Sequence, residues 1–462
     1  MEAVSSSVLT KKQAVLFFWV AGVVGCLALA TWFLVPHNLI MLAVAAVAGS
    51  GVGLLVFAFP RHGNYFGIFY VFAGISYYTS LPVVAPVTFL VTAAVLFRLF
   101  RGDSIRVRDP LFNWSLAVFT VFALQSFLFA WDFGYASNAF GFFAKSVLLV
   151  FLIGQLVRTE RDLEELALVV FAATLSTVIL GVLNFKFGIV KNWTVLVGAI
   201  GWLRFGTTHM NPNNAALYLV SGLPLAVYAI KRVRPVVFRV LLVVGAVAMV
   251  AATIMTFSRQ AIFPLSVVLL AVLFKEARSK WVYAGVLFVV VIGVLLVPQY
   301  YWYRISTISQ MFGEMTGDFS LMIRVKALVT GWHLFLQHPF TGIGLDNFIV
   351  RSASELPVTM VAHNGYLEIL TGVGLFGFIA YIMMPVAAIR GFVRAIKTRW
   401  PEEHRWMNDL SYYFLLSLIA VLIGTFFQHV HFYRLFWLPV AAGVVAGILA
   451  DEARRRAKKT ET

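Results

Sequence analysis

Unbroken apolar runs of about 20 residues recur along the whole chain, and that length suits a helix crossing a bilayer. The 462 residues are 61% hydrophobic and only 12% charged. A soluble domain is about half apolar and about a quarter charged. Disorder requires low hydrophobicity, and a transmembrane β-barrel shows weak alternation in short segments. The sequence therefore predicts an all-α polytopic membrane protein.

Fourteen apolar runs can be marked, of which the third, fourth and tenth are short for a membrane core of about 30 Å. Since those three could be broken or re-entrant, twelve spans remain an alternative to fourteen. The runs cover residues 13–34, 38–59, 64–80, 82–98, 111–131, 139–157, 164–185, 213–230, 236–257, 259–274, 281–298, 364–389, 409–428 and 433–450.

Basic residues are distributed unevenly over the loops between these runs. If the N-terminus is cytoplasmic, the inner loops hold most of the 36 lysines and arginines, and every one of those loops is basic. The positive-inside rule predicts this distribution, with both termini in the cytoplasm. The net charge of +16 is then mainly a signature of topology, so no nucleic-acid partner is needed to explain it.

Two outer segments are longer than the other loops, and long ordered loops in compact proteins are usually functional. They divide the chain into residues 1–298, with spans 1 to 11 and the outer loop 186–212, a periplasmic loop 299–363, and residues 364–462, with spans 12 to 14 and a cytoplasmic tail. Within the second loop we expect an amphipathic helix near 321–337 that lies on the outer interface or caps the bundle. Its apolar face would contain Leu321, Val325, Leu328, Trp332 and Phe335.

The spans are almost free of charge, and Lys145 is the clear exception. Ion-coupled transporters usually carry charged residues at mid-membrane depth, because the coupling ions need partners there. Lys145 more readily extends to the interface or pairs with a carbonyl. A lipid or polysaccharide transporter is thus the more distant alternative, since it would need access to both faces, whereas the long loop lies on one.

An arginine lies near the predicted outward start of two helices. Arg204 precedes Asn211-Pro212-Asn213, in which Asn before Pro supplies a helix cap. Arg259 follows Ser258, which can cap the next helix, in a connection with almost no loop. Guanidinium groups and helix N-termini both suit phosphate oxygens. The alternative at each position is a solvated or interfacial arginine.

His363 and Asn364 lie at the outward start of the twelfth run, where Gly365, Gly372, Gly374 and Gly377 give the helix a small-residue face for close packing. Histidine transfers protons near neutral pH. Most of the nine histidines map to the outer side, where an amphipathic headgroup residue is the alternative. Together with the two arginines, the pattern predicts a phosphate-bearing group bound at the outer surface beside a histidine base.

Motifs for metal or nucleotide chemistry are missing from the sequence. It contains no phosphate-binding Gly-rich loop, no zinc-protease motif and no nucleophile elbow. Glu314 and Asp318 could hold a cation, but a solvated loop face is the commoner meaning of such a pair. His429-Val430-His431 offers two potential ligands, and such pairs are usually coincidental. We therefore expect chemistry that needs neither a metal nor another cofactor.

Four blocks between residues 204 and 377 resemble the O-antigen ligase and polymerase superfamily. His363-Asn364, followed after nine residues by Gly374-Leu375-Phe376-Gly377, resembles the ligase signature His-[Asn/Ser/Gln]-x9-Gly-x-x-Gly. Residues 337–348, beginning Gln337-His338-Pro339, resemble the superfamily's His-Pro-x-x-Gly-x-Gly-x-x-Asn-Phe block. Thr256–Arg259 is similar to its Ser-Arg element, and Arg204 with Asn211-Pro212-Asn213 to its Arg…Asn-Pro-Asn element.

The resemblance implies a GT-C-like glycosyltransferase of the bacterial inner membrane. Such enzymes move a glycan from undecaprenyl diphosphate to an acceptor at the periplasmic face. Ligases use lipid A–core as the acceptor, while O-antigen or exopolysaccharide polymerases use a second lipid-linked glycan. The ligase signature favours a ligase, and fourteen spans, which depart from the twelve usual in ligases, keep a polymerase as the alternative.

The resemblance also implies roles for individual residues in a direct, inverting transfer. His363 would be the catalytic base, and Arg204 and Arg259 would hold the diphosphate. Either Asn364 or Glu368 would orient His363. The remaining candidates, which would support the site or contact the acceptor, are Arg324, His338, Asn211 and Asn213.

Overall fold

The computed structural model describes residues 51–75, 83–107, 109–187, 196–197, 202–203, 205, 211–276, 284, 288, 319–357 and 359–461. The chain divides into two units, residues 1–105 and 106–462. In the first unit, α3 (Pro60–Phe72) packs against α5 (Val84–Phe100). The contact is close at Gly63, where an added Cβ would come within 3.1 Å of Val91.

The second unit is built almost entirely of helices, as the sequence predicts. Its only described strands are β1 (Leu196–Val197) and β2 (Trp202–Leu203), which pair antiparallel. The helices are α6 (Pro110–Gln125), η1 (Ser126–Phe129), α7 (Phe133–Leu156), α8 (Glu160–Phe187), α9 (Pro212–Arg232), α10 (Val236–Met255), η3 (Arg259–Ala261), α11 (Ile262–Glu276), α14 (Phe319–Gln337), α15 (Phe348–Glu355), α16 (Gly365–Lys397), η5 (Glu402–His404), α17 (Trp406–Thr425) and α18 (Arg434–Glu461).

Eight helices in the described part of the chain are long and apolar enough to cross a membrane. They coincide with eight of the predicted runs, from 111–131 to 433–450. The runs 64–80, 82–98 and 259–274 correspond to the shorter helices α3, α5 and α11. The runs 13–34 and 281–298 and most of 38–59 lie outside the described residues, so the predicted total of fourteen or twelve stays a prediction.

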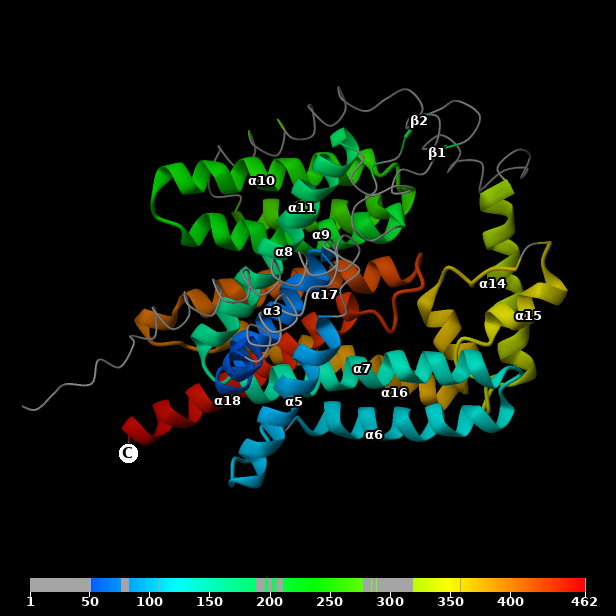
Figure 1. The fold of residues 1–462 in the computed structure, drawn as a ribbon, viewed down its shortest axis with the longest axis horizontal. Helices are drawn as coiled ribbons and strands as arrows, with labels where there is room; N and C mark the ends of the chain where they lie inside the picture. Colours follow the sequence, from blue (N-terminus) through cyan, green and yellow to red (C-terminus); the bar gives the residue numbers. More distant parts are fainter. Residues whose placement is uncertain are drawn as a thin grey trace, which may run out of the picture. The chain divides into compact units, whose positions relative to one another are not determined.

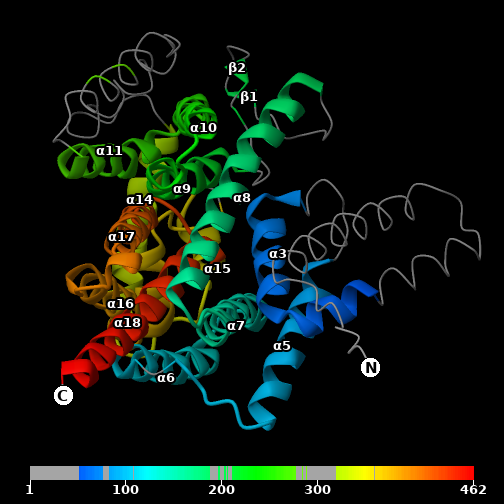
Figure 2. The ribbon, with the colours of Figure 1, turned by 90° about the vertical axis from the view of Figure 1, so that its left-hand side faces the viewer.

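Helix α16 is the centre of the second unit and packs against α18, α6 and α17. Figures 1 and 2 show these helices alongside one another. Small residues let α16 and α18 approach closely, since a Cβ added at Gly391 would lie 2.0 Å from the Gly443 carbonyl oxygen. Two ends can be distinguished by this helix: the His363 end, where α16 begins, and the Arg394 end, where it finishes.

Charged side chains at the Arg394 end pair across helices. Arg394 contacts Asp109 at 2.7 Å and Asp451 at 2.8 Å, which joins α16 to the start of α6 and to α18. Lys231 and Lys275 both contact Asp409, at 3.0 Å and 2.7 Å. These basic residues all belong to predicted inner loops or to the helix ends that flank them.

The predicted amphipathic helix near 321–337 is confirmed as α14, and Figure 1 shows it crossing near the ends of the bundle helices. The predicted apolar face is not the face that packs against the bundle. Leu328 and Trp332 are 39% and 51% exposed, and the side chain of Leu321 lies outside the described part. The face that packs instead contains Ile323, Ala327, Thr330, Gly331 and Leu334.

Small residues explain this difference. Ala327 and Gly331 let α14 approach α16 so closely that a Cβ at Gly331 would lie 2.6 Å from Leu367. Around this contact a buried apolar cluster forms from α14, the segment after it, α15 and the start of α16. Its members are Ala327, Leu334, Ile343, Phe348, Leu356, Ala362 and Leu367. The helix thus caps the bundle while an apolar stripe stays exposed.

Candidate functional site

Helix α16 is broken at Gly374, nine residues after its first turn begins. Gly374 has φ 73° and ψ −177°, a conformation open essentially to glycine alone. The loop at 339–344 enters this break. Ile343 and Gly344 donate backbone hydrogen bonds to the Thr371 and Gly372 carbonyls, at 2.9 Å and 3.1 Å. The backbone groups that the break would leave unpaired are therefore partly satisfied by the loop.

The same contact joins two of the sequence blocks, because Leu375 donates its backbone N–H to Pro339 at 2.7 Å. The predicted small-residue face of this helix packs partly against the loop and not only against neighbouring helices. A Cβ at Gly342 would lie 2.2 Å from the Gly372 oxygen, and one at Gly374 would lie 2.7 Å from Phe340. Only Gly365 and Gly377 face other helices, α17 and α6.

His363 directly precedes the capped start of α16, as predicted. Asn364 is the N-cap, and its side-chain oxygen accepts hydrogen bonds from the Tyr366 and Leu367 amides, both at 3.1 Å. His363 itself has φ 52°, in the left-handed region that a β-carbon disfavours. The backbone on both sides of this histidine is thus fixed in an unusual conformation.

Glu368 fixes the other side of the same turn. Its Oε1 accepts a hydrogen bond from the Ala362 amide at 2.6 Å, while its Oε2 lies 2.6 Å from His429 Nδ1. Asn364 and Glu368 both hold the backbone next to His363, one after it and one before it.

The side chain of His363 is partly buried. Burial and the nearby Arg324 guanidinium lower the pKa of His363 to about 4, and the charge on Glu368 opposes this shift. The imidazole is accordingly neutral at neutral pH and has a basic nitrogen available. The effect of Arg324 also places that candidate residue, from α14, within electrostatic range of His363.

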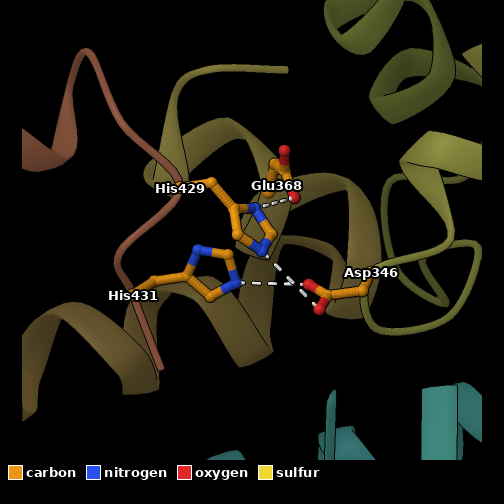
Figure 3. A group of neighbouring side chains, drawn as sticks. All are labelled: Asp346, Glu368, His429 and His431. Atoms are coloured by element: carbon orange, nitrogen blue, oxygen red, sulfur yellow. Dashed lines mark hydrogen bonds and ion pairs between the residues drawn. The ribbon is translucent and has the colours of Figure 1, made fainter. Parts of the chain in front are cut away.

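Four side chains gather next to this turn: Asp346, Glu368, His429 and His431 (Figure 3). Asp346 follows the loop that enters the α16 break, and the two histidines come from the connection between α17 and α18. Each histidine directs Nε2 toward Asp346, at 3.7 Å for His429 and 3.3 Å for His431. The contacts with both histidines hold the pKa of the Asp346 carboxyl well below its usual range despite its burial.

The start of α9 joins the site through Gln428, which precedes these histidines. Asn211 is the N-cap of α9 and accepts a hydrogen bond from the Asn213 amide at 2.9 Å, so the predicted cap is confirmed. Gln428 donates its side-chain amide to the Asn213 carbonyl at 2.8 Å, and its backbone carbonyl accepts from the Gly365 amide at 3.1 Å. The Asn-Pro-Asn block and the His-Asn block are therefore connected.

Arg259 begins η3, in the tight connection between α10 and α11 that the sequence predicts. Ser258 occupies the N-cap position, but its hydroxyl makes no capping hydrogen bond, so the predicted side-chain cap is wrong. The reason is that Thr256 Oγ1 accepts the Ser258 amide at 3.2 Å and Phe257 has φ 51°, which makes the turn without a serine cap.

Arg204 lies outside the described residues. Its neighbour Phe205 is described, is buried, and donates its backbone N–H to the Met255 carbonyl at 2.9 Å. This hydrogen bond joins the segment after β2 to the last residue of α10. The chain next to Arg204 is thus attached four residues before Arg259.

His338 ends α14, where its amide donates to the Leu334 carbonyl and its own carbonyl accepts from Gly342, each at 3.1 Å. Its described contacts shape the turn that leads into the α16 break. Among the candidates, Asn364 and Glu368 lie in the same turn as His363, and Arg324 acts on His363 electrostatically. Asn211 and Asn213 are joined to the start of this turn's helix through Gln428.

Sequence reasoning missed Asp346 and set aside His429 and His431 as coincidental. The alternation His-x-His did carry a signal, because Val430 between them is buried and both rings turn to the same carboxylate. Asp346 gave a weaker signal within the His-Pro block. Asp346 lies beside His429 and His431 only because the loop before it enters the break in α16.

Comparison with known proteins adds one finding. Residues 244–382 match the model of the O-antigen ligase family, and this match covers the second half of α10, then α11, α14, α15 and the first half of α16. No curated protein matches the chain. The resemblance to the O-antigen ligase superfamily is confirmed over this part of the chain. The match and the eight apolar helices support a multi-pass membrane enzyme of the O-antigen ligase or polymerase type.

Proposed function

We propose, from the match to the O-antigen ligase family, that this chain is a glycosyltransferase that moves a glycan from undecaprenyl diphosphate to an acceptor at the periplasmic face of the inner membrane. The observation that carries the proposal is the His363 turn. A neutral, partly buried histidine precedes a capped helix N-terminus, inside the matched segment and within electrostatic range of an arginine.

His363 acts as the general base in this proposal. The acceptor hydroxyl oxygen attacks the anomeric carbon, the bond from that carbon to the phosphate oxygen breaks, and undecaprenyl diphosphate leaves with the electron pair. His363 takes the hydroxyl proton during the attack. Because attack comes from the side opposite the leaving group, the transfer inverts the anomeric centre, and no metal takes part in the step.

Positive charge on the donor side stabilises the leaving diphosphate. Arg259 and Arg204 bind its oxygens, and the attachment of Phe205 beside the end of α10 supports their acting together. Arg324 and His338 contact the acceptor or a phosphate. Asn211 and Asn213 support the site through the start of α9 and Gln428.

The acceptor distinguishes a ligase from a polymerase. The His-Asn-x9-Gly-x-x-Gly signature favours the ligase, in which the acceptor is lipid A–core. The same chemistry would serve a polymerase if the acceptor were a second lipid-linked glycan. The His363 end would then act in the same way in a ligase and in a polymerase, and only the bound acceptor would differ.

A reconstituted transfer assay tests the proposal. The purified protein receives a labelled undecaprenyl-diphosphate glycan, with and without lipid A–core, and both products are resolved by gel. A ligase adds one glycan chain per lipid A–core, whereas a polymerase makes a ladder on the carrier without it. We expect His363→Ala to lower transfer by roughly 100-fold or more, because it removes the general base.

Matched variants separate chemistry from folding. Arg259→Ala should lower transfer by a comparable factor of about 100 through the lost stabilisation of the leaving group. The controls are His333→Ala, at an exposed position on α14, and Arg351→Ala, whose guanidinium lies over the Trp131 ring. Both should retain activity. Wild-type transfer by the His363→Ala protein would exclude His363 as the base.

A further inference from the structure

We propose that Asp346, His429 and His431 bind one first-row divalent transition-metal ion of the zinc type, with Glu368 holding His429 in position. The three ligands come from two connections that meet at the start of α16, as Figure 3 shows. The ion takes no part in the transfer step, and its binding can be tested whether or not the proposed function holds.

The separations between these side chains suit a shared ion better than direct hydrogen bonds. His431 Nε2 lies 3.3 Å from Asp346 Oδ1, and His429 Nε2 lies 3.7 Å from Asp346 Oδ2. Nitrogen-to-oxygen hydrogen bonds usually measure about 2.7–3.2 Å. Two atoms bound about 2.1 Å from a tetrahedral zinc ion lie about 3.4 Å apart. One ligand atom from each of the four side chains lies within 4.8 Å of the others.

Burial of two carboxylates together favours a cation at this place. The side chains of His431 and Glu368 are 1% and 2% exposed, and that of Asp346 is 21% exposed. A buried carboxylate is costly unless it is paired. Histidines that bind a metal are neutral, so in the ion-bound cluster the charge of one divalent ion would balance the two carboxylates.

Glu368 provides the outer support that histidine ligands of metals commonly have. A ligating histidine usually directs its second ring nitrogen to a carboxylate, which fixes the ring and the tautomer. His429 Nδ1 lies 2.6 Å from Glu368 Oε2, so Nε2 is the nitrogen that faces Asp346. Glu368 is itself held by the Ala362 amide at 2.6 Å.

The backbone that carries the ligands is fixed independently of any ion. Asn347, next to Asp346, donates its side-chain amide to the Leu345 carbonyl at 2.9 Å and accepts from the Asp132 amide at 2.7 Å. The His431 carbonyl accepts from Trp437 Nε1 at 2.9 Å. The ligands are thus held in place before an ion binds, which lowers the cost of binding.

The donor set selects the kind of ion. Two imidazole nitrogens with one carboxylate suit Zn²⁺ and neighbouring transition metals, whereas Mg²⁺ and Ca²⁺ prefer oxygen ligands. The ion would fasten the α17–α18 connection to the loop that enters α16. Because Glu368 also holds the residue before His363, the ion would stabilise the turn that carries the proposed base.

Metal titration of the full-length protein in detergent tests the site. The protein is stripped with a chelator and titrated with Zn²⁺ by calorimetry, and with Co²⁺, whose visible absorption reports its coordination geometry. We expect one ion per chain. His431→Ala and Asp346→Asn should abolish saturable binding, and Glu368→Gln should weaken it about 10- to 100-fold.

The control is His404→Ala, which removes a histidine that faces Glu403 at the other end of the bundle and should bind as the wild type does. Circular dichroism and gel filtration check that each variant is folded. If His431→Ala fails to fold, the nearly isosteric Asp346→Asn decides the question. The proposal is overturned if the stripped wild type takes up neither ion, which would make the cluster a network of imidazolium and carboxylate alone. Equal binding by wild type and Asp346→Asn would also overturn it.

Discussion

The Arg394 end and the His363 end of the bundle hold their polar groups in different ways. At the Arg394 end, arginines and lysines pair with carboxylates between helices of regular backbone. At the His363 end lie all three of the described non-glycine residues with positive φ: Phe257, Asp346 and His363. Each belongs to a candidate motif or to the four-residue cluster. Backbone strain of this kind persists where the surroundings enforce it, and it concentrates at functional sites.

The charges at the Arg394 end reflect the topology of the protein in the membrane, whereas the polar groups at the His363 end belong to the candidate site. The charge pairs at the Arg394 end neutralise loops that the positive-inside rule requires to be basic, and they join helices α6, α16 and α18. The His363 end instead uses glycine conformations, a broken helix and buried titratable groups. We therefore expect changes at the His363 end to alter activity or local folding, and changes at the Arg394 end to alter stability alone.

The largest expected effect is at Gly374. Gly374→Ala forces a β-carbon into a glycine-only conformation and within 2.7 Å of the Phe340 backbone. We expect destabilisation of roughly 3 kcal/mol, seen as a lower thermal unfolding temperature in detergent, together with loss of transfer. The matched control is Gly141→Ala in α7, where an added Cβ meets nothing within 4 Å. Equal stability of the two variants would show that the break is not enforced.

The next effect is on the pH dependence of transfer. The neutral form of His363 is the active base, so transfer should fall as the pH drops through the pKa of this residue, near 4. Arg324→Gln removes a charge that lowers this pKa, so the acidic limb of the kcat/KM profile should move to higher pH. Lys326→Gln, an exposed change on the same helix, should leave the limb in place. An unmoved limb in Arg324→Gln would separate Arg324 from the base.

The smallest effect is expected at the Arg394 end. Asp109→Ala removes both the N-cap of α6, which accepts from the Phe112 amide at 3.0 Å, and the pair with Arg394. Destabilisation of about 1–3 kcal/mol should follow, with unchanged transfer per folded molecule. Asp451→Ala, at a half-exposed partner of the same arginine, should cost less than about 1 kcal/mol. A selective fall in kcat for Asp109→Ala would contradict the separation of the two ends.

Properties that depend on local pattern were predictable from the sequence. Eight spans follow from apolar runs, and the cap at Asn211 follows from Asn before Pro at a helix start. Each of these features depends on a single segment of the chain, since a span needs only enough apolar residues and a cap needs only its own backbone amides. The positions of His363, Arg259 and Arg204 at or near outward helix starts already placed these residues on one side of the membrane, and the resemblance added their individual roles.

Properties that depend on contacts between distant segments were not predictable in the same way. The face by which α14 packs on α16 did not follow from the apolar pattern, because Ala327 and Gly331 count little in such a pattern yet permit the closest approach. The meeting of Asp346 with His429 and His431 depends on the loop that enters the α16 break and on the α17–α18 connection. The His-x-His alternation places both rings on one side of its own segment, but nothing in the sequence pattern shows that Asp346 lies opposite them.

The break in α16 also sets the boundaries within which this protein can be recombined with relatives. The first half of the helix, which follows His363, is hydrogen-bonded at its end to residues 339–344 as well as to its own continuation. A chimaera that exchanges the helix without that loop would join a helix break and a loop whose hydrogen-bonding groups were not matched to each other. Residues 319–397 are therefore the smallest block that carries α14, the loop and both halves of the broken helix together.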